Sequence, residues 1–266
     1  MAKMTSYRHG VPCWVDVSAV DVEATGRFYA GLFGWTVEAD MGPDGGGYRM
    51  LSKNGMHVGG LGPLMQEGAP PSWTTYINVD DVDAAMAKIG PAGGTVVVPA
   101  MDLPMESGRI GMALDAAGGF FALFQAGANH FGAQVCNEVG ALTWSELTTR
   151  DVERNLSFYS DVFGWDIETT DMGEMGLYHL LQVSGRSVAG CMTMDASWPD
   201  DLPTHWMTYF AVDDVDATSS RCTELGGAVP VSAFDTPVGR MAVLNDPNGA
   251  VFSIGAFTSI DDPNAW

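Results

Sequence analysis

The chain repeats itself in its second half, and this repeat constrains the fold more than any other feature. FYAGLFGW at Phe28–Trp35 returns as FYSDVFGW at Phe158–Trp165, 130 residues later. YINVDDVDA, which begins at Tyr76, returns as YFAVDDVDA from Tyr209, and GRIGMALDAAGG returns as GRMAVLNDPNGA. Because the same segments recur in the same order, the two halves are two copies of one unit.

The copies are separated by a segment with neither a helical nor a strand period. This segment, AGANHFGAQVCNE, begins at Ala126. Such a stretch is typical of a connection between domains. We therefore expect a first domain over residues 1–127, a linker over 128–139, a second domain over 140–260 and a tail over 261–266.

Within each copy one pattern of elements occurs twice. Alternating Val15 and Val17 indicate a strand that ends at Asp21, a residue type that caps helices, and an apolar helical face follows. Asn54-Gly55 then predicts a hairpin, and after the strand WTTYINV the pattern restarts with Asp81 as the next cap. The sequence thus predicts an α+β protein with four βαβββ modules. Since one such sheet cannot bury both faces, paired modules are expected to curl as mixed sheets around cavities, where ligands bind.

Composition excludes several classes of function. Asp and Glu total 33 against 12 Lys and Arg, a net charge of -21, so the surface should repel nucleic acids and anionic membranes. The acidity serves either solubility or the attraction of a cationic ligand. The 4 cysteines lack metal-type spacing, and neither a signal peptide nor a long apolar run is present, so we expect a cytoplasmic protein. We expect a monomer or homodimer that binds a small-molecule ligand or substrate.

The motifs together resemble the vicinal oxygen chelate superfamily, which contains glyoxalases, extradiol dioxygenases, and the bleomycin and fosfomycin resistance proteins. They are the strand–Asp–helix start, FY..(L/V)FGW, VDDVDA, and DPNG before an apolar strand. The tandem arrangement is similar to that of two-domain actinobacterial glyoxalase-like proteins. The resemblance implies tandem glyoxalase-like domains. In chelating members it also implies a divalent metal that is held by His, Gln or Glu and polarises vicinal oxygens of the substrate.

This chain departs from the chelating pattern at every position that the resemblance assigns to a metal ligand. The first position carries Trp14 in one copy and Trp144 in the other, and the indole nitrogen is only a donor. The other ligand positions hold Thr74, Met207, Gly60, Gly190, Ala122 and Ser253. We therefore expect no metal and no cofactor.

Strand alternation indicates what lines the cavities instead. If Trp14 and Trp144 face inward, so do Asp16 and Glu146, two residues later on each strand. The candidate ligand-binding residues are Trp14, Trp144, Tyr76, Thr74, Met207, Tyr48 and Tyr178. The two Trp side chains either fill the space left by the metal or stack on a planar ligand.

Four residues are candidates for catalysis: Asp16, Glu146, His205 and Tyr209. An inward carboxylate either accepts hydrogen bonds from its neighbours or has a chemical role, because burying it without either is costly. His205 is either a structural strand residue or an acid or base.

Two functional hypotheses follow. The first is a protein that binds a planar or aromatic metabolite or drug in a metal-free cavity, in antibiotic resistance or biosynthesis. The alternative is a metal-independent isomerase, lyase or cyclase, or a hydroxylase-type tailoring enzyme, with Asp16 or Glu146 as general base and Tyr76, Tyr209 or His205 as proton donor. A metal-dependent glyoxalase or dioxygenase ranks third.

Overall fold

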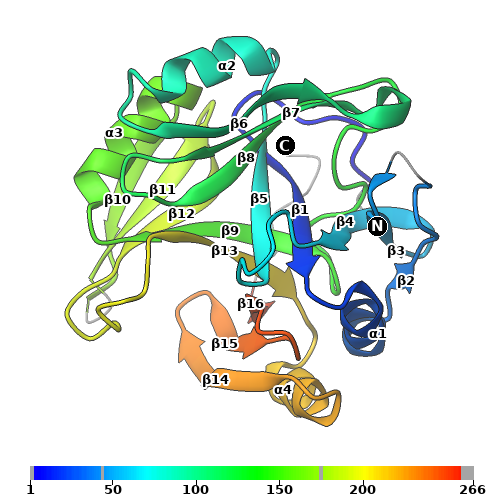
Figure 1. Cartoon of the computed structure of the whole chain (residues 1–266). Coiled ribbons are helices and arrows are strands. Elements are labelled where there is room, and N and C mark those ends of the chain that lie inside the picture. The colour runs from blue at the N-terminus through cyan, green and yellow to red at the C-terminus, as the bar shows by residue number, and fades with distance from the viewer. Residues whose placement is uncertain (1–2, 43–44, 174–175, 259–266) are drawn as a thin grey trace.

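The computed structural model describes residues 3–42, 45–173 and 176–258. It is an α+β fold of two eight-stranded mixed sheets, neither of which closes (Figure 1). The predicted tail, 261–266, lies outside the described residues, as do the last two positions of the predicted second domain. The domain boundaries themselves stay a prediction.

The first half forms one sheet and two helices. Its elements are β1 (Pro12–Ala19), α1 (Val22–Phe33), β2 (Thr36–Val37), β3 (Arg49–Lys53), β4 (Met56–Pro63), β5 (Ser72–Asn78), α2 (Val82–Ile89), β6 (Thr95–Asp102), β7 (Gly108–Leu114) and β8 (Phe120–Ala126). They are arranged in the order β2-β3-β4-β1-β5-β8-β7-β6.

The second half repeats this arrangement. Its elements are β9 (Leu142–Thr149), α3 (Val152–Phe163), β10 (Asp166–Asp171), β11 (Leu177–Val183), β12 (Arg186–Thr193), β13 (His205–Ala211), α4 (Val215–Glu224), β14 (Ala228–Thr236), β15 (Gly239–Asn245) and β16 (Val251–Phe257). The strand order is β10-β11-β12-β9-β13-β16-β15-β14. In each sheet the two βαβββ modules meet at a central antiparallel pair, β1 with β5 or β9 with β13. The four predicted modules are confirmed.

The local signals act as the sequence predicts. The Asp21 carboxylate accepts a hydrogen bond from the Ala24 backbone N–H at 2.9 Å and begins α1, while Gly34 ends it with a φ of 71°. Asn54 and Gly55 both have positive φ, 52° and 75°, which the tight turn between β3 and β4 requires.

Two hydrophobic cores lie between the sheets, and each draws on both halves of the chain. Helices α1 and α4 pack together at one end, and α2 and α3 pack together at the other (Figure 1). The first core joins Phe28 and Tyr29 of α1 to Phe210 and Phe252 of the second sheet. Consequently neither half completes its own core.

A buried hydrogen-bond network crosses from one half to the other in the first core. The Tyr29 hydroxyl on α1 donates to the Asp246 carboxylate at 3.3 Å and accepts from Trp73 Nε1 at 2.9 Å. Asp246 is held in turn by the backbone N–H groups of Asn248 and Ala250. The FY and DPNG motifs are therefore parts of one contact between the halves.

The second core contains the matching network. The Tyr159 hydroxyl on α3 donates to Asp115 at 3.0 Å and accepts from Trp206 Nε1 at 2.8 Å. The FGW tryptophans also cross: Trp35 donates to the Gly140 carbonyl and Trp165 to the Gly10 carbonyl, each at 2.7 Å. These reciprocal contacts fix the two sheets back to back.

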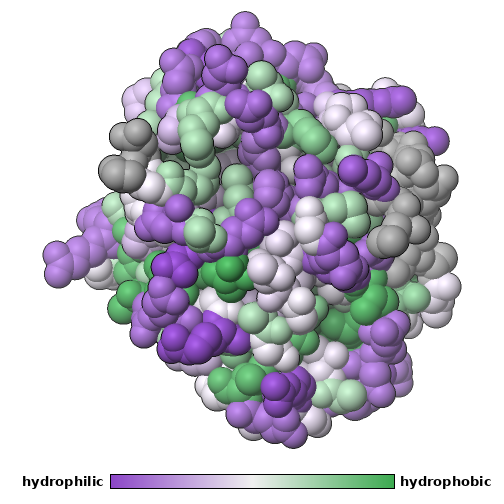
Figure 2. Space-filling model, turned by 90° about the vertical axis from the view of Figure 1, so that its right-hand side faces the viewer, coloured by the Kyte–Doolittle hydropathy of each residue, from purple (hydrophilic) through white to green (hydrophobic). Residues whose placement is uncertain are grey.

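The surface reflects the acidic composition. Figure 2 shows mainly hydrophilic residues on the side at the right of Figure 1, with hydrophobic residues in separate patches. No helix among the described residues is long and apolar enough to cross a membrane.

Removal of either tyrosine hydroxyl should destabilise the whole chain rather than one half. We expect Tyr29→Phe and Tyr159→Phe each to lower the free energy of unfolding by about 2 kcal/mol, because a buried carboxylate and an indole N–H lose a partner. Urea unfolding followed by fluorescence and circular dichroism measures this. Both variants should unfold in a single transition. Two transitions, in which one half of the chain unfolds before the other, would contradict the shared cores.

Candidate ligand site

Each sheet has one face packed on the helices and one face turned away from them, which we call the first and second open faces. On β1, Val15 and Val17 are fully buried in the core with α1. Strand alternation turns Trp14 and Asp16 to the first open face, and it turns Trp144 and its neighbours on β9 to the second.

On the first open face a buried carboxylate accepts two phenol hydroxyls. Tyr76 donates to Asp16 Oδ2 at 2.7 Å and Tyr48 donates to the same oxygen at 3.1 Å. Trp14 Nε1 donates to the Tyr48 hydroxyl at 3.0 Å, and Thr74 also hydrogen-bonds Asp16. Five residues named from the sequence therefore form one cluster.

The second open face carries the same arrangement with Glu in place of Asp. Tyr178 donates to Glu146 Oε2 at 2.6 Å and Tyr209 to Oε1 at 2.7 Å. Trp144 Nε1 donates to the Tyr178 hydroxyl at 2.9 Å, and Met207 lies opposite Glu146 on the neighbouring strand. Both carboxylates therefore accept hydrogen bonds from neighbouring phenols, the first of the two alternatives left by the sequence, and keep further acceptor capacity.

Burial changes the acidity of these groups. It raises the pKa of Asp16 to about 6, against the opposing effect of the hydrogen bonds from Tyr76, Tyr48 and Thr74. Burial likewise raises the pKa of Glu146, opposed by its two tyrosines. The tyrosine pKa values are raised by burial and by the carboxylates, so the phenols stay protonated. Each cluster combines a proton acceptor with donors.

The residues do not fit a chelated metal of the family type. A Cβ added at Gly60 would lie 1.8 Å from the Tyr48 hydroxyl, and one at Gly190 would lie 1.9 Å from that of Tyr178. The phenols thus fill the space that a glutamate ligand needs. No group of three His, Cys, Asp or Glu residues is placed to hold a metal anywhere in the described part of the chain.

The two open faces differ in what covers them. Over the first, the linker brings the ring of His130 to 4.6 Å from that of Trp14 and 5.2 Å from that of Phe124, measured between centroids. The linker is fixed there, since the Ala133 N–H donates to the Cys13 carbonyl at 2.8 Å. Only 8% of His130 is exposed.

The second open face is more accessible. The side chains of Trp144, Tyr178 and Tyr209 are only partly buried, although Glu146 itself is 6% exposed. Farther along this face lies an apolar strip in which β14 residues pair with β15 residues. The strip consists of Val231, Phe234, Met241 and Val243, of which Val231 is 45% and Phe234 39% exposed.

His205 stands apart from the carboxylate. Its Nδ1 lies 2.8 Å from the Pro203 carbonyl, and it is paired in register with Thr148 rather than with Glu146. Burial lowers its pKa, so the ring is neutral at physiological pH. Within the described part of the chain no hydrogen bond or ring contact joins His205 to the Glu146 cluster, and its role as an acid or base stays a prediction.

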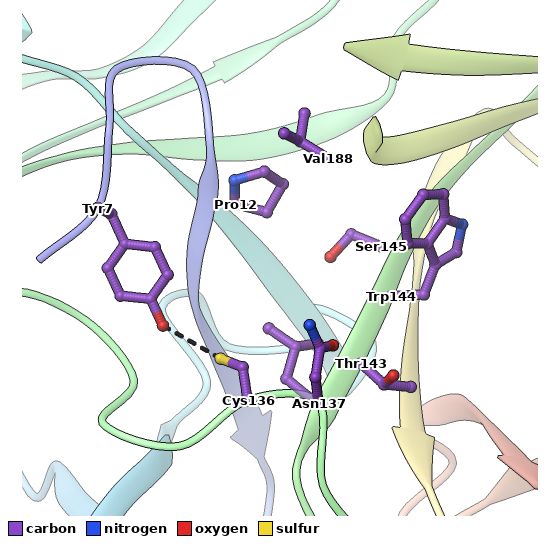
Figure 3. A pocket seen from close by; sticks show the side chains of 9 residues that line it. Tyr7, Pro12, Cys136, Asn137, Thr143, Trp144, Ser145 and Val188 are labelled. Carbon is purple, nitrogen blue, oxygen red and sulfur yellow. Dashed lines mark hydrogen bonds between the residues drawn. The ribbon is translucent and has the colours of Figure 1, made fainter. Parts of the chain in front are cut away.

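A small cavity lies where the N-terminal segment, the linker and β9 meet. Figure 3 shows Tyr7, whose hydroxyl is 3.1 Å from Cys136 Sγ, and Trp144 on the opposite wall. Its volume of about 20 Å³ holds roughly one water molecule. It is too small for an organic ligand and belongs to the junction between the halves.

Sequence reasoning missed His130 and the apolar strip. The linker has no period that could assign His130 to a face, so no sequence signal was available. Phe124 could have been found, because it follows Ala122 by two positions on β8. Register shifts between β14 and β15 disrupt the alternation that would have revealed Phe234.

Comparison with known proteins places these features in context. The model of the Glyoxalase/Bleomycin resistance protein/Dioxygenase superfamily matches residues 14–120 and 137–254. The chain is 42% identical over 259 residues to "Putative glyoxylase CFP32" of Mycobacterium tuberculosis, covering 96% of this chain and 97% of that protein. It is 36% identical over 266 residues to "Anthracycline biosynthesis protein DnrV" of Streptomyces peucetius, covering 94% of each.

Solved structures share the fold at low identity. The Mn(II)-bound glyoxalase from Novosphingobium aromaticivorans has a TM-score of 0.65 at 16% identity, with 96% of this chain and 86% of that chain covered. The 2,2',3-trihydroxybiphenyl 1,2-dioxygenase from Sphingomonas wittichii has a TM-score of 0.64 at 16% identity, with 97% and 94% covered. These likenesses concern the fold alone.

The raised pKa of Asp16 predicts how stability depends on pH. The folded state disfavours the charged form of Asp16. The protonated carboxyl therefore contributes its full stabilisation below pH 3.8, the ordinary pKa, and this stabilisation is lost as the pH rises through the folded-state pKa of about 6. Relative to D16N, wild type should lose about 3 kcal/mol of unfolding free energy over this range. Denaturant titrations at several pH values measure the difference, and a constant difference would contradict the shift.

Divalent metals should leave the protein unchanged. Because the phenols occupy the ligand positions, we expect manganese, nickel, zinc or ferrous iron to shift the melting temperature by less than about 1 °C. Differential scanning fluorimetry with each metal and with a chelator checks this. A metal-specific rise that the chelator reverses would contradict the geometry.

Proposed function

Because the chain belongs to the glyoxalase/bleomycin resistance protein/dioxygenase superfamily and its chelating positions hold no metal ligands, we propose that it binds a planar aromatic small molecule on the second open face without a metal. The observation that carries this proposal is the buried Glu146 carboxylate, which accepts from Tyr178 and Tyr209, together with the partly exposed ring of Trp144, which donates to Tyr178. A small-molecule ligand is what members of this fold family bind.

The cluster favours a ligand that carries a hydroxyl or ammonium donor. Each Glu146 oxygen accepts one tyrosine hydroxyl and retains a further lone pair. A donor on the ligand would satisfy it, while Trp144 stacks on the ring system. The net charge of -21 also attracts a cationic substituent to the protein.

The name of one relative agrees with this ligand class. The Streptomyces peucetius protein is described as an anthracycline biosynthesis protein, and anthracyclines contain fused planar rings with phenolic hydroxyls. That description supports, for this chain, a polycyclic aromatic metabolite or drug as the class to test first.

A second candidate function is metal-independent proton transfer, favoured by the raised pKa of Glu146. A raised pKa makes a carboxylate a stronger base toward an acidic C–H or hydroxyl. Tyr209 and Tyr178 donate to the same carboxylate, so either phenol can return a proton to the ligand. This chemistry corresponds to an isomerase, lyase or cyclase.

Binding is tested with quinizarin, a dihydroxyanthraquinone. Titration followed by tryptophan fluorescence and calorimetry should give saturable binding. Trp144→Ala should weaken it at least about 10-fold, because the stacking surface is lost. Asp16→Asn is the matched control on the first open face and should bind as wild type does. Equal affinity in wild type and Trp144→Ala would place the ligand elsewhere.

Proton transfer is separated from binding by Glu146→Gln. If the second function holds, exchange of an acidic carbon-bound proton of the ligand with deuterated solvent should fall about 100-fold in this variant while binding persists. Nuclear magnetic resonance of the bound ligand measures the exchange. Exchange at the wild-type rate in Glu146→Gln would exclude the carboxylate as the base.

A further inference from the structure

The first open face carries the same set of chemical groups as the second, yet part of the chain lies over it. Trp14, Tyr48, Tyr76 and Asp16 reproduce the second cluster, with hydrogen bonds between corresponding residues. The difference is the linker, whose His130 ring packs against that of Trp14 at an interplanar angle of 82°.

The linker is anchored on both sides of His130. The Gly127 N–H donates to the His130 carbonyl at 2.9 Å, and Tyr7 donates to the Ala133 carbonyl at 2.7 Å. Gln134 exchanges two hydrogen bonds with the backbone of His57 on β4. These contacts hold the linker without using the His130 side chain. That side chain fills the space between the linker and the first open face.

His130 fills that space as an uncharged planar ring. Among the described residues the imidazole makes ring contacts, with Trp14, Phe124 and His57, but no hydrogen bond. Burial, with a smaller contribution from His57, lowers its pKa to about 4. The ring is therefore placed by its packing against Trp14 and Phe124 rather than by a hydrogen bond.

We propose that the first open face is a second binding site for a planar ring, which the chain itself fills with His130. A free ligand enters only when linker residues 128–132 are displaced. The ligand class rests on the proposed function, whereas the occupation of the site by His130 does not. The site on the first open face therefore has a lower apparent affinity than the site on the second, reduced in proportion to the fraction of molecules in which the linker is displaced.

The occupation is tested by removing the ring and supplying it from solution. His130→Gly should melt at a lower temperature than wild type, and added imidazole at pH 8, where it is neutral, should raise the melting temperature by about 3 °C. Wild type should show no such rise, nor should His9→Gly, which removes a histidine outside both open faces. His130→Ala repeats the test with less change in backbone freedom, and His130→Phe should keep the site filled.

Two results would overturn the proposal. One is the absence of an imidazole-dependent rise in both His130→Gly and His130→Ala. The other is an equal rise in wild type, which would place imidazole outside the vacated space. Because imidazole is the probe, these results stand whether or not the protein binds aromatic metabolites.

The ligand class is tested separately by stoichiometry. With quinizarin, wild type should bind one molecule per chain. His130→Gly, in which no ring holds the linker against Trp14 and the linker is displaced more readily, should bind two, and its combination with Trp144→Ala should retain only the site on the first open face. Imidazole rescue without the second quinizarin molecule would keep the ring site but contradict its ligand class. Absence of quinizarin binding in wild type would instead count against the proposed function.

Discussion

The structure depends on two reciprocal hydrogen bonds between its halves, from Tyr29 to Asp246 and from Tyr159 to Asp115. Each joins a helix of one half to the turn before the last strand of the other, inside a core that both halves build. The helices therefore pack in pairs at the two ends of the molecule, each on one face of its sheet, and the opposite faces of the sheets are left for ligands. The contacts that join the two halves therefore also determine which face of each sheet is left for a ligand.

Features with a local cause could be predicted from the sequence. Helix caps, the hairpin at Asn54-Gly55 and the four modules follow from short segments, and alternation along β1 and β9 placed Asp16 and Glu146 beside their tryptophans. The position of His130 could not be predicted, because backbone contacts with distant residues determine it. The sequence therefore predicted that both open faces carry Trp, Tyr and a carboxylate, but it could not predict that the linker covers the first face and leaves the second accessible.

The two open faces show how one set of side chains acquires different roles. The hydrogen bonds around Asp16 and Glu146 correspond, so the difference between the faces lies in what covers each of them. The covered cluster on the first open face contains Asp16, whose pKa is raised to about 6, and without a ligand it contributes to packing and to pH-dependent stability. The accessible cluster around Glu146 keeps polar groups and rings within reach of a ligand.

The contact of Tyr48 and Tyr178 with glycine has an evolutionary consequence. A glutamate at Gly60 or Gly190 would push the phenol from its carboxylate and indole partners, while loss of the phenol alone would leave a buried carboxylate short of a donor. Either single substitution is harmful, and only the pair restores room for a chelating side chain. Metal chemistry would therefore require a coupled exchange of this pair in each half, in addition to new ligands at the other positions.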